Sequence, residues 1–390
     1  MIAVFFVAAL LVVGAGHFYL WRRLVRDTTT STRLRRVGFW VAVALLVLTF
    51  ATFAGTRVLP GWLGTALAWP GYLWLALFFY LLVILGVLEL PALAVRLVQR
   101  RRAARADVGT PARTQVESRR LFLARTVAVT AGVASATLVG AGVREALGMP
   151  QLKRIQIPLA RLPRSADGLR IALVSDIHLG PLNRGARTGR IVDLVNGLDA
   201  DLVAIVGDLV DGSVAELGPA AASLRNLRSR QGTFFVTGNH EYFSGYEEWL
   251  AEVDRLGMRA LRNERVELPG GLDLAGVNDV TGDQYGDGPD FDAALGGRDP
   301  ARPVVLLAHQ PIQAHDAARH GVDLQLSGHT HGGQITPFQL IVSASGQPVV
   351  SGLGEVDGMP VYVTNGAGFW GPPVRVGAPP DVTLVELRTP

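Results

Sequence analysis

The sequence predicts an α/β domain preceded by an all-α transmembrane region. Two observations separate these parts at about residue 150. Residues 1–150 contain long apolar stretches and hold 17 Lys and Arg against 5 Asp and Glu, whereas residues 151–390 hold 20 against 28. From residue 151 onward, short β-rich runs alternate with polar helical stretches, which is typical of an α/β fold with one main core. The net charges of +12 and −8 therefore belong to two different units.

Residues 1–100 are expected to form three transmembrane helices, because a bilayer core of roughly 30 Å needs about 20 apolar helical residues. The three apolar stretches are residues 1–21, 37–58 and about 69–95. A fourth stretch, 121–143, follows a basic linker within residues 101–150 and is richer in small residues. The sequence SRRLFLAR before it is similar to a twin-arginine export signal, although an arginine-flanked membrane helix gives the same pattern.

The arginine residues of this region predict its orientation in the membrane. The segments between the first and second stretches and between the third and fourth hold 14 of its 17 basic residues, and the segment near residues 59–68 holds none. By the positive-inside rule, both basic segments lie in the cytosol. We therefore expect a multi-pass protein of the cell membrane, with residues 151–390 on the extracytoplasmic face.

Strands and helices alternate after residue 151. The expected strands are residues 170–175, 202–206, 233–237, 272–277, 304–308, 324–326, 361–364 and 383–387. The expected helices are residues 184–198, 214–229, 245–257 and 311–320. The chain has no cysteine, which excludes disulfides, thiolate metal ligands and a cysteine nucleophile.

Side chains that can bind metals directly follow five of these strands. In chain order they are Asp176 and His178, Asp208 and Asp211, Asn239 and His240, His309, and His329 and His331. Ligands gather beyond the carboxyl ends of strands in open α/β sheets, so we expect all nine residues at one rim. A single Asp or His at a strand end is usually a cap or a surface residue, but five strands with the same feature are far more specific.

The nine residues suit particular cations. Carboxylate and imidazole without thiolate favour Mn²⁺, Fe or Zn²⁺ over Ca²⁺ or Mg²⁺. The three remaining histidines are interpreted as solvated or interfacial residues: His17, His315 and His320. Arg375 could supply a cation for a substrate or could be an ordinary surface arginine.

The motifs DIH, GDLVD, GNHE, a lone histidine after a strand, and GHTH, in this order, resemble the calcineurin-like metallophosphoesterases. The resemblance covers about residues 168–390. GHTHGGQ and NGAGFWGPPVRVGAPP are most similar to a membrane-attached bacterial branch of that family. The resemblance implies that residues 151–390 form a four-layer sandwich, two mixed sheets flanked by helices, with two divalent metal ions at the strand ends.

The resemblance also implies a role for each of the nine residues. The first metal ion would be held by Asp176, His178, Asp208 and His331. Asp208 would bridge to the second ion, whose other ligands would be Asn239, His309 and His329. His240, oriented by Asp211, would donate a proton to the substrate or to the leaving group.

These features predict a membrane-anchored phosphohydrolase that attacks its substrate with a metal-bridging hydroxide. Gly212 follows GDLVD where family members that act on phosphoproteins usually have arginine, which counts against a protein phosphatase. We expect a phosphodiesterase or pyrophosphatase, and membrane anchoring favours envelope or lipid-linked phosphate esters as its substrates. One alternative is a membrane scaffold or sensor with a structural metal site, which would need neither His240 nor Asp211. The other is a nuclease of the same superfamily, but a nuclease needs a basic groove and this half of the chain is acidic.

Overall fold

The computed structural model describes the backbone of residues 2–59, 61–103 and 113–390, and the side chains of residues 7–59, 61–90 and 118–390. The chain forms two compact units, Met1–Ala141 and Gly142–Pro390. Part of the predicted basic linker, residues 104–112, lies outside the described residues. Each unit is described by itself.

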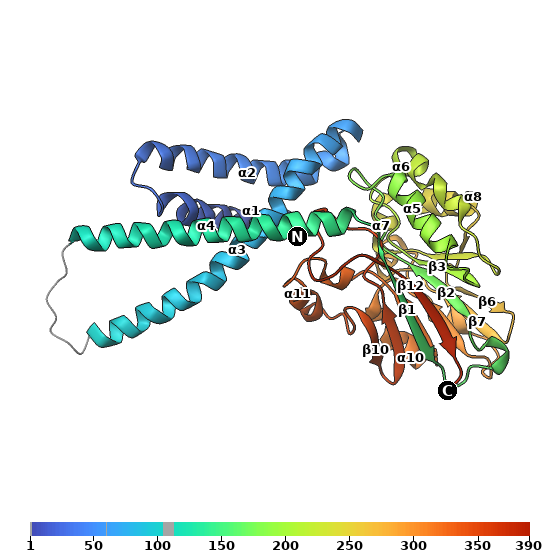
Figure 1. Ribbon diagram of the computed structural model, residues 1–390. Coiled ribbons are helices and arrows are strands. Elements are labelled where there is room, and N and C mark those ends of the chain that lie inside the picture. Colours follow the sequence, from blue (N-terminus) through green and yellow to red (C-terminus); the bar gives the residue numbers. More distant parts are fainter. Residues whose placement is uncertain (1, 60, 104–112) are drawn as a thin grey trace. The chain divides into compact units, whose positions relative to one another are not determined.

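The first unit consists of long helices (Figure 1). They are α1 (Ile2–Leu20), which continues as a π-helical segment (Trp21–Arg26), α2 (Thr32–Val58), α3 (Gly61–Ala103) and α4 (Arg113–Leu147). Leu20 of α1, Phe78, Leu81 and Leu85 of α3, and Ala131 of α4 form a buried apolar cluster. Residues 142–147, the end of α4, belong to the second unit.

Three of the described helices contain segments long and apolar enough to cross a membrane: Thr32–Val58, Gly61–Leu90 and Ser118–Leu147. These segments contain or overlap the second, third and fourth predicted stretches. The first predicted stretch coincides with α1, but the side chains of residues 1–6 lie outside the described residues, so this span stays a prediction. The segment near residues 59–68, which separates the second and third predicted stretches, is helical from Gly61 onward.

His17 differs from its interpretation as an interfacial residue. Its side chain is buried, and its ring stacks on Phe78 with centroids 4.3 Å apart. Trp74 Nε1 donates a hydrogen bond of 3.1 Å to His17 Nε2. The sequence does not reveal this role, because both ring partners lie on α3, about sixty residues away.

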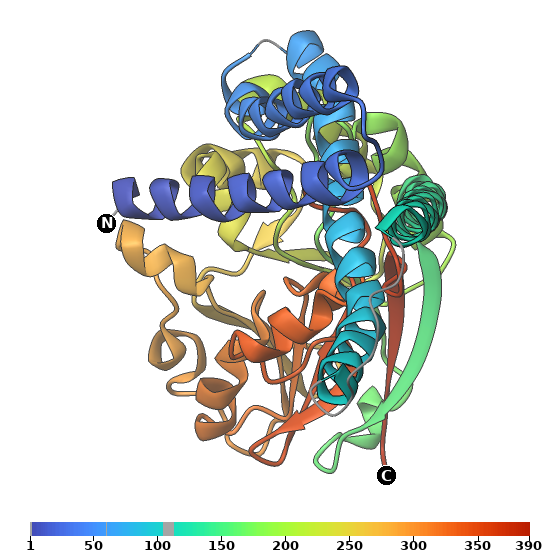
Figure 2. The same ribbon diagram turned by 90° about the vertical axis from the view of Figure 1, so that its left-hand side faces the viewer.

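The second unit contains two six-stranded mixed sheets. The first sheet has the order β1-β12-β2-β3-β4-β5, and its strands are β1 (Gln151–Pro158), β2 (Arg170–Val174), β3 (Leu202–Val206), β4 (Thr233–Val236), β5 (Arg259–Ala260) and β12 (Asp381–Arg388). The second has the order β10-β11-β9-β8-β7-β6, and its strands are β6 (Glu264–Leu268), β7 (Leu272–Gly276), β8 (Val304–Leu307), β9 (Leu324–Ser327), β10 (Gly352–Val356) and β11 (Met359–Val363). Figures 1 and 2 both show β1 beside β12, which pair in parallel over eight residues.

The two sheets pack face to face and helices cover their outer faces. One apolar cluster contains residues of both sheets, including Leu173, Val206, Leu274 and Leu307. A second cluster joins the first sheet to α5 (Gly185–Asn196), α6 (Val214–Ala221) and α8 (Tyr246–Arg255), and a third joins the second sheet to α9 (Phe291–Leu295) and α10 (Ala314–Arg319). The four-layer sandwich of two mixed sheets flanked by helices is therefore confirmed.

Several elements differ from the sequence-based expectation. The predicted helix 214–229 is the short α6 followed by a 3-10 turn, Ala222–Asn226, since Pro219 within α6 removes a helical hydrogen bond. Residues 311–320 likewise begin as a 3-10 turn, Pro311–Gln313. The prediction omitted β1, β5, β6 and β10, and the short helices α7 (Asn239–Ser244), α9 and α11 (Gln339–Ala344). All four omitted strands are sheet edges, where a side chain has fewer apolar neighbours and the sequence pattern is weaker.

Candidate metal centre

The nine predicted side chains lie together where strands of both sheets end. In the first sheet, Asp176 and His178 follow β2, Asp208 and Asp211 follow β3, and Asn239 and His240 begin α7 just after β4. In the second, His309 follows β8, and His329 and His331 follow β9. The sequence predicted one rim, and the structure forms that rim from the carboxyl ends of strands in two facing sheets.

The backbone of these turns adopts conformations that L-residues rarely occupy. Positive φ angles, between 49° and 70°, occur at Asp176, His178, Asp208, His329 and His331. Such conformations cost free energy and cluster at functional sites. The turns after β3 and β4 also approach closely, because a Cβ atom at Gly238 would lie 2.3 Å from Asp208 Oδ1.

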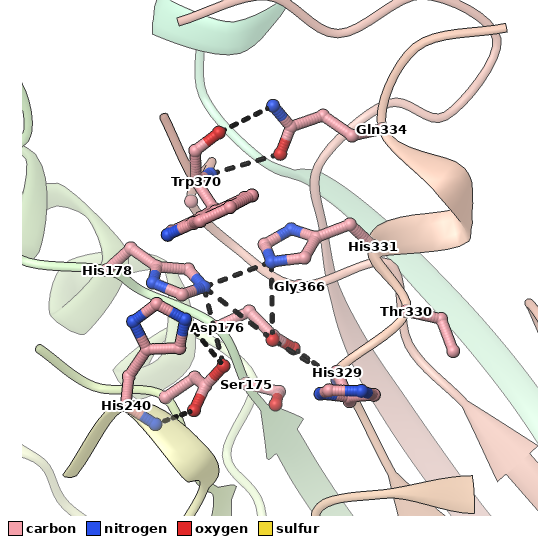
Figure 3. Close-up of polar contacts among 12 residues, drawn as sticks. Ser175, Asp176, His178, His240, His329, Thr330, His331, Gln334, Gly366 and Trp370 are labelled. Carbon is pink, nitrogen blue, oxygen red and sulfur yellow. Dashed lines mark hydrogen bonds and ion pairs between the residues drawn. The ribbon is translucent and has the colours of Figure 1, made fainter. Parts of the chain in front are cut away.

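The first group of donors consists of Asp176, His178 and His331. His178 Nε2 lies 3.0 Å from His331 Nε2, and His331 Nε2 lies 3.5 Å from Asp176 Oδ1. Figure 3 shows these side chains pointing toward one another. All three side chains are buried, so their carboxylate oxygen and imidazole nitrogens face one another and not bulk water.

The second group consists of Asp208, His309 and His329. Asp208 Oδ2 lies 3.2 Å from His309 Nε2 and also 3.7 Å from His178 Nε2 of the first group. His329 Nδ1 lies 3.0 Å from Asn239 Oδ1, which joins the asparagine to this group. Asp208 thus lies between the two groups of donors.

His240 lies beside both groups, at the edge of the site. Its Nδ1 donates a hydrogen bond of 2.6 Å to Asp211 Oδ1, and its Nε2 lies 4.0 Å from Asp208 Oδ2. Burial lowers the pKa of His240, but Asp208 and Asp211 outweigh burial and raise that pKa to about 9. His240 is therefore protonated at neutral pH in this arrangement.

Asp211 has a second contact that the sequence did not indicate. Its Oδ1 also lies 2.9 Å from His178 Nδ1. Burial raises the pKa of Asp211, but His178 and His240 outweigh it and hold that pKa well below its usual range. One carboxylate thus orients two imidazoles, and it directs Nε2 of His178 into the first group of donors.

The residues fit a pair of divalent cations. Ligand bonds of about 2.0–2.2 Å place two ligand atoms of one ion roughly 2.8–3.6 Å apart. The separations of 3.0, 3.2 and 3.5 Å in the two groups agree with this spacing. His309 Nε2 is buried and faces Asp208 Oδ2 at 3.2 Å without a well-aligned hydrogen bond, whereas its Nδ1 lies 2.7 Å from the carbonyl oxygen of Val206. A metal ion bound at Nε2 of His309 would satisfy this nitrogen.

The charges in the site support the same conclusion. Burial lowers the pKa of His329 to about 3, with His309 contributing, and burial beside Arg375 lowers the pKa of His331. Both rings are therefore neutral, as metal-binding imidazoles must be. Burial lowers the pKa of His309, but the neighbouring carboxylate of Asp208 outweighs burial and raises that pKa above its ordinary value. Without a metal ion, a proton on His309 compensates the negative charge of Asp208. A divalent cation bound to both side chains would take the place of that proton.

Arg375 is neither a surface arginine nor a residue that can touch a substrate. Its side chain is 1% exposed. Nη1 donates to the carbonyl oxygen of His331 at 2.8 Å, Nη2 lies 2.8 Å from Nδ1 of the same histidine, and Nη2 also donates to the carbonyls of Asn365 and Gly368. Arg375 therefore holds both the backbone and the ring of His331 in place.

Glu241 of GNHE holds the site together, a role that was not predicted. Its Oε2 accepts hydrogen bonds from the backbone N–H groups of Asp208, at 2.9 Å, and Gly238, at 2.6 Å. Its Oε1 accepts one from Leu209 at 2.7 Å. The buried carboxylate thus joins the turn after β3 to the turn after β4. The signal in the sequence was a glutamate at the third position of a helix that follows a glycine turn.

Replacing Glu241 with glutamine is expected to lower the free energy of unfolding by about 2–4 kcal/mol, because an amide NH₂ would face a backbone donor. Denaturant unfolding of the detergent-solubilised chain, followed by circular dichroism, measures this loss. Glu248→Gln, at an exposed position of α8, is the control and should change the stability by less than about 0.5 kcal/mol. Equal stability of the two variants would contradict the role of Glu241.

Comparisons with known proteins agree with this geometry. The family model described as calcineurin-like phosphoesterase matches residues 169–333. The chain is 42% identical over 249 residues to an uncharacterized metallophosphoesterase of Helicobacter pylori, covering 63% of this chain and 66% of that protein. It is 35% identical over 403 residues to a transmembrane protein with metallophosphoesterase domain of Bos taurus, covering 98% of this chain and 88% of that protein.

The chain belongs to the calcineurin-like metallophosphoesterases. By family it is a metal-dependent phosphoesterase, as the sequence predicted, and the Asp and His groups suggest a dinuclear site for divalent metals. Among solved structures, a dimetal phosphatase of Danio rerio is 13% identical with a TM-score of 0.37, covering 52% of this chain and 88% of that one. The phosphopantetheinyl hydrolase of Mycobacterium tuberculosis is 14% identical with a TM-score of 0.31, covering 50% and 88%.

Proposed function

We propose that this metallophosphoesterase is a membrane-anchored phosphohydrolase that works with two divalent metal ions. The observation that carries the proposal is the position of Asp208 Oδ2, 3.7 Å from His178 Nε2 in one group of donors and 3.2 Å from His309 Nε2 in the other. A carboxylate can bind two cations at once, whereas a neutral imidazole binds one. Asp208 is therefore the natural bridge between two ions.

The proposed ligands are the seven residues predicted from the sequence. The first ion would be held by Asp176, His178, Asp208 and His331, and the second by Asp208, Asn239, His309 and His329. This set of carboxylate, imidazole and amide oxygen is suited to Mn²⁺, Fe or Zn²⁺. When bound, two such ions neutralise the charge of a phosphate group and activate a water molecule for attack on phosphorus.

His240 is proposed as the proton donor to the leaving group. Its ring is held at Nδ1 by Asp211, and its Nε2 lies at the edge of the site, 4.0 Å from Asp208 Oδ2. Its side chain is 15% exposed, whereas that of His178 is fully buried, so a bound ester can reach the free nitrogen of His240. Asp211 acts through His240 and His178, and we propose it as a positioning residue.

The proposed substrates are phosphodiesters or pyrophosphates of the cell envelope or attached to lipids. Position 212 is glycine, so the chain has no arginine there to hold the free oxygens of a phosphomonoester. Three described helices suited to crossing a membrane and the name of the Bos taurus relative support membrane anchoring. The distribution of arginine residues in the first 150 residues favours the extracytoplasmic face for the catalytic unit.

Metal removal tests the proposed function. The full-length chain in detergent, stripped of metal with a chelator, is expected to hydrolyse bis(p-nitrophenyl) phosphate only after Mn²⁺, Fe²⁺ or Zn²⁺ is returned, and to bind two ions. p-Nitrophenyl phosphate should be hydrolysed more slowly, since the site lacks a monoester clamp. Metal content is measured by mass spectrometry beside the rates. Two bound ions without turnover of either ester would support a structural metal site and would overturn the hydrolase.

A further inference from the structure

Five large apolar side chains lie exposed on the loops and short helices around the metal centre. We call them the apolar rim: Phe243, Phe338, Leu340, Ile341 and Trp370, between 40% and 68% exposed. Two of them flank His240, because the ring centroids of Phe243 and Trp370 lie 5.7 and 5.9 Å from that of the histidine. Figure 3 shows Trp370 and His240 on the same side of the site. The rim therefore borders the site itself.

Hydrogen bonds join the two loop segments that carry most of this rim. Gln334 Nε2 donates to the carbonyl oxygen of Trp370 at 2.8 Å, and Gln334 Oε1 accepts from the backbone N–H of Trp370 at 3.0 Å. The backbone N–H of Val376 donates to the carbonyl of Gln334 at 3.0 Å, and that of Thr336 donates to the carbonyl of Val376 at 2.9 Å. Residues 334–341 and 370–377 thus form one continuous surface.

The end of a membrane-length helix docks on this surface. Gly142 lies in the span Ser118–Leu147, and its carbonyl accepts a hydrogen bond of 2.9 Å from the backbone N–H of Arg375. A Cβ atom at position 142 would lie 2.5 Å from Val374 Cγ1, so the contact requires a glycine. In the proposed membrane-anchored protein, Gly142, near the carboxyl end of the span, would lie close to the bilayer surface, and Arg375 and its neighbours would lie there with it.

The composition of these segments also fits a bilayer surface. Residues 332–354, most of which are exposed or half-buried, contain no Asp, Glu, Lys or Arg. Surfaces that face water are typically about a quarter to a third charged, so an uncharged stretch of this length beside exposed aromatic and aliphatic side chains is unusual. Tryptophan is enriched at membrane interfaces, where its ring and its N–H group are both accommodated.

We propose that the apolar rim inserts into the bilayer surface, so that the metal centre takes its phosphate directly from the membrane. The substrate class is then an amphiphile, a phosphodiester or pyrophosphate with a long hydrocarbon chain. This proposal rests on the proposed hydrolase activity for its substrate, but the insertion of the rim does not depend on it. Side chains such as Leu340 and Ile341 enter the boundary between headgroups and acyl chains, typically about 5–10 Å deep.

The absence of cysteine makes insertion directly measurable. A nitroxide is attached to Leu340→Cys in the full-length chain, reconstituted in vesicles of equal parts phosphatidylethanolamine and phosphatidylglycerol. The control is Arg225→Cys, an exposed position on the 3-10 turn Ala222–Asn226, which lies beside the end of α5 that is farther from the site. We expect the label at 340 to collide with oxygen, which dissolves in lipid, and the label at 225 with a water-soluble nickel chelate.

A label at 340 that meets the nickel chelate as readily as the label at 225 overturns the proposal. A label at 340 that is shielded from both reagents, and whose spectrum is broadened by a nearby second nitroxide, also overturns it. In that case a second copy of the chain covers the apolar rim. Neither measurement needs an active enzyme. The insertion of the rim is therefore tested even if the protein hydrolyses nothing.

Turnover tests the substrate class. Leu340→Ser/Ile341→Ser is compared with the native chain on hexadecyl p-nitrophenyl phosphate in vesicles and on ethyl p-nitrophenyl phosphate in solution, two esters with the same leaving group. The double variant should lose about tenfold on the long-chain ester and stay within about twofold on the short one. Equal losses on both esters would overturn the proposal. If the native chain cleaves neither ester, the proposed hydrolase fails and the labelling result still stands.

Discussion

Replacing Asp208 with asparagine is expected to abolish binding of both metal ions and to lower kcat/KM for a phosphodiester on the order of 10³-fold or more. The amide keeps the shape of the side chain but removes its charge. Asp208 Oδ2 lies within 4.0 Å of three imidazole nitrogens, those of His178, His240 and His309. Among the described residues, Asp208 is the carboxylate that shares a group of possible donors both with His178 and with His309, so it is the proposed bridge.

Metal content and turnover are measured together for this variant. Mass spectrometry counts ions per chain after dialysis, and the hydrolysis of bis(p-nitrophenyl) phosphate gives the rate. Asp199→Asn is the matched control, because Asp199 is exposed and lies before β3, at the opposite end of the strand from Asp208. Asp208 Oδ1 also accepts a hydrogen bond from the backbone N–H of His240, so circular dichroism must confirm the fold. Two ions retained by Asp208→Asn would contradict its role as the bridge.

Replacing His240 with asparagine is expected to lower kcat by about 10²–10⁴-fold while both metal ions remain bound. His240 bonds to Asp211 and also forms a third group of possible donors with His178 and Asp208, but it is not among the proposed ligands. Its loss should therefore remove a proton donor and leave the seven proposed ligands in place. The loss should be larger for an ester with a poor leaving group, such as an alkyl alcohol, than for one that releases p-nitrophenol. A poor leaving group depends more on protonation in the transition state.

The dependence on the leaving group separates a proton donor from a structural histidine. His315→Asn is the control, since His315 is exposed, pairs with Asp357 and lies outside the site. It should leave kcat unchanged within about twofold. A loss in His240→Asn that is the same for both leaving groups would show that His240 does not donate the proton. Loss of metal would instead assign His240 to the ligands.

The site was predictable because its signal is local. Each cluster of polar residues directly follows an apolar strand: Asp208 follows residues 202–206, and His309 follows residues 304–307. The same short stretch of sequence therefore predicts both the strand and the site residue at its end. Parallel strands of one sheet place their carboxyl ends at one edge, which brings Asp176 after β2 and Asp208 after β3 together although 32 positions separate them. The roles of the nine residues as ligands and proton donor stay predictions.

Other features were not predictable, because they depend on contacts between distant segments. Arg375 looked like a substrate or surface residue, yet it is buried behind His331. Glu241 looked incidental, yet it joins two turns through backbone N–H groups. His17 looked interfacial, yet Trp74 and Phe78 enclose it. The partners of Arg375 and His17 are not marked by residue type or spacing.

The sequence by itself determined the division into an apolar basic region and an acidic α/β region, the family, and the residues that gather at the strand ends. It did so because periodicity, charge and strand-end motifs are short-range properties of the chain. Only the tertiary structure decided that the rim is formed by two facing sheets, that Asp211 orients two histidines, and that Gly142 and residues 370–377 meet. Those features arise from packing, in which the backbone and side chains of segments far apart in the sequence satisfy one another's hydrogen bonds and apolar contacts.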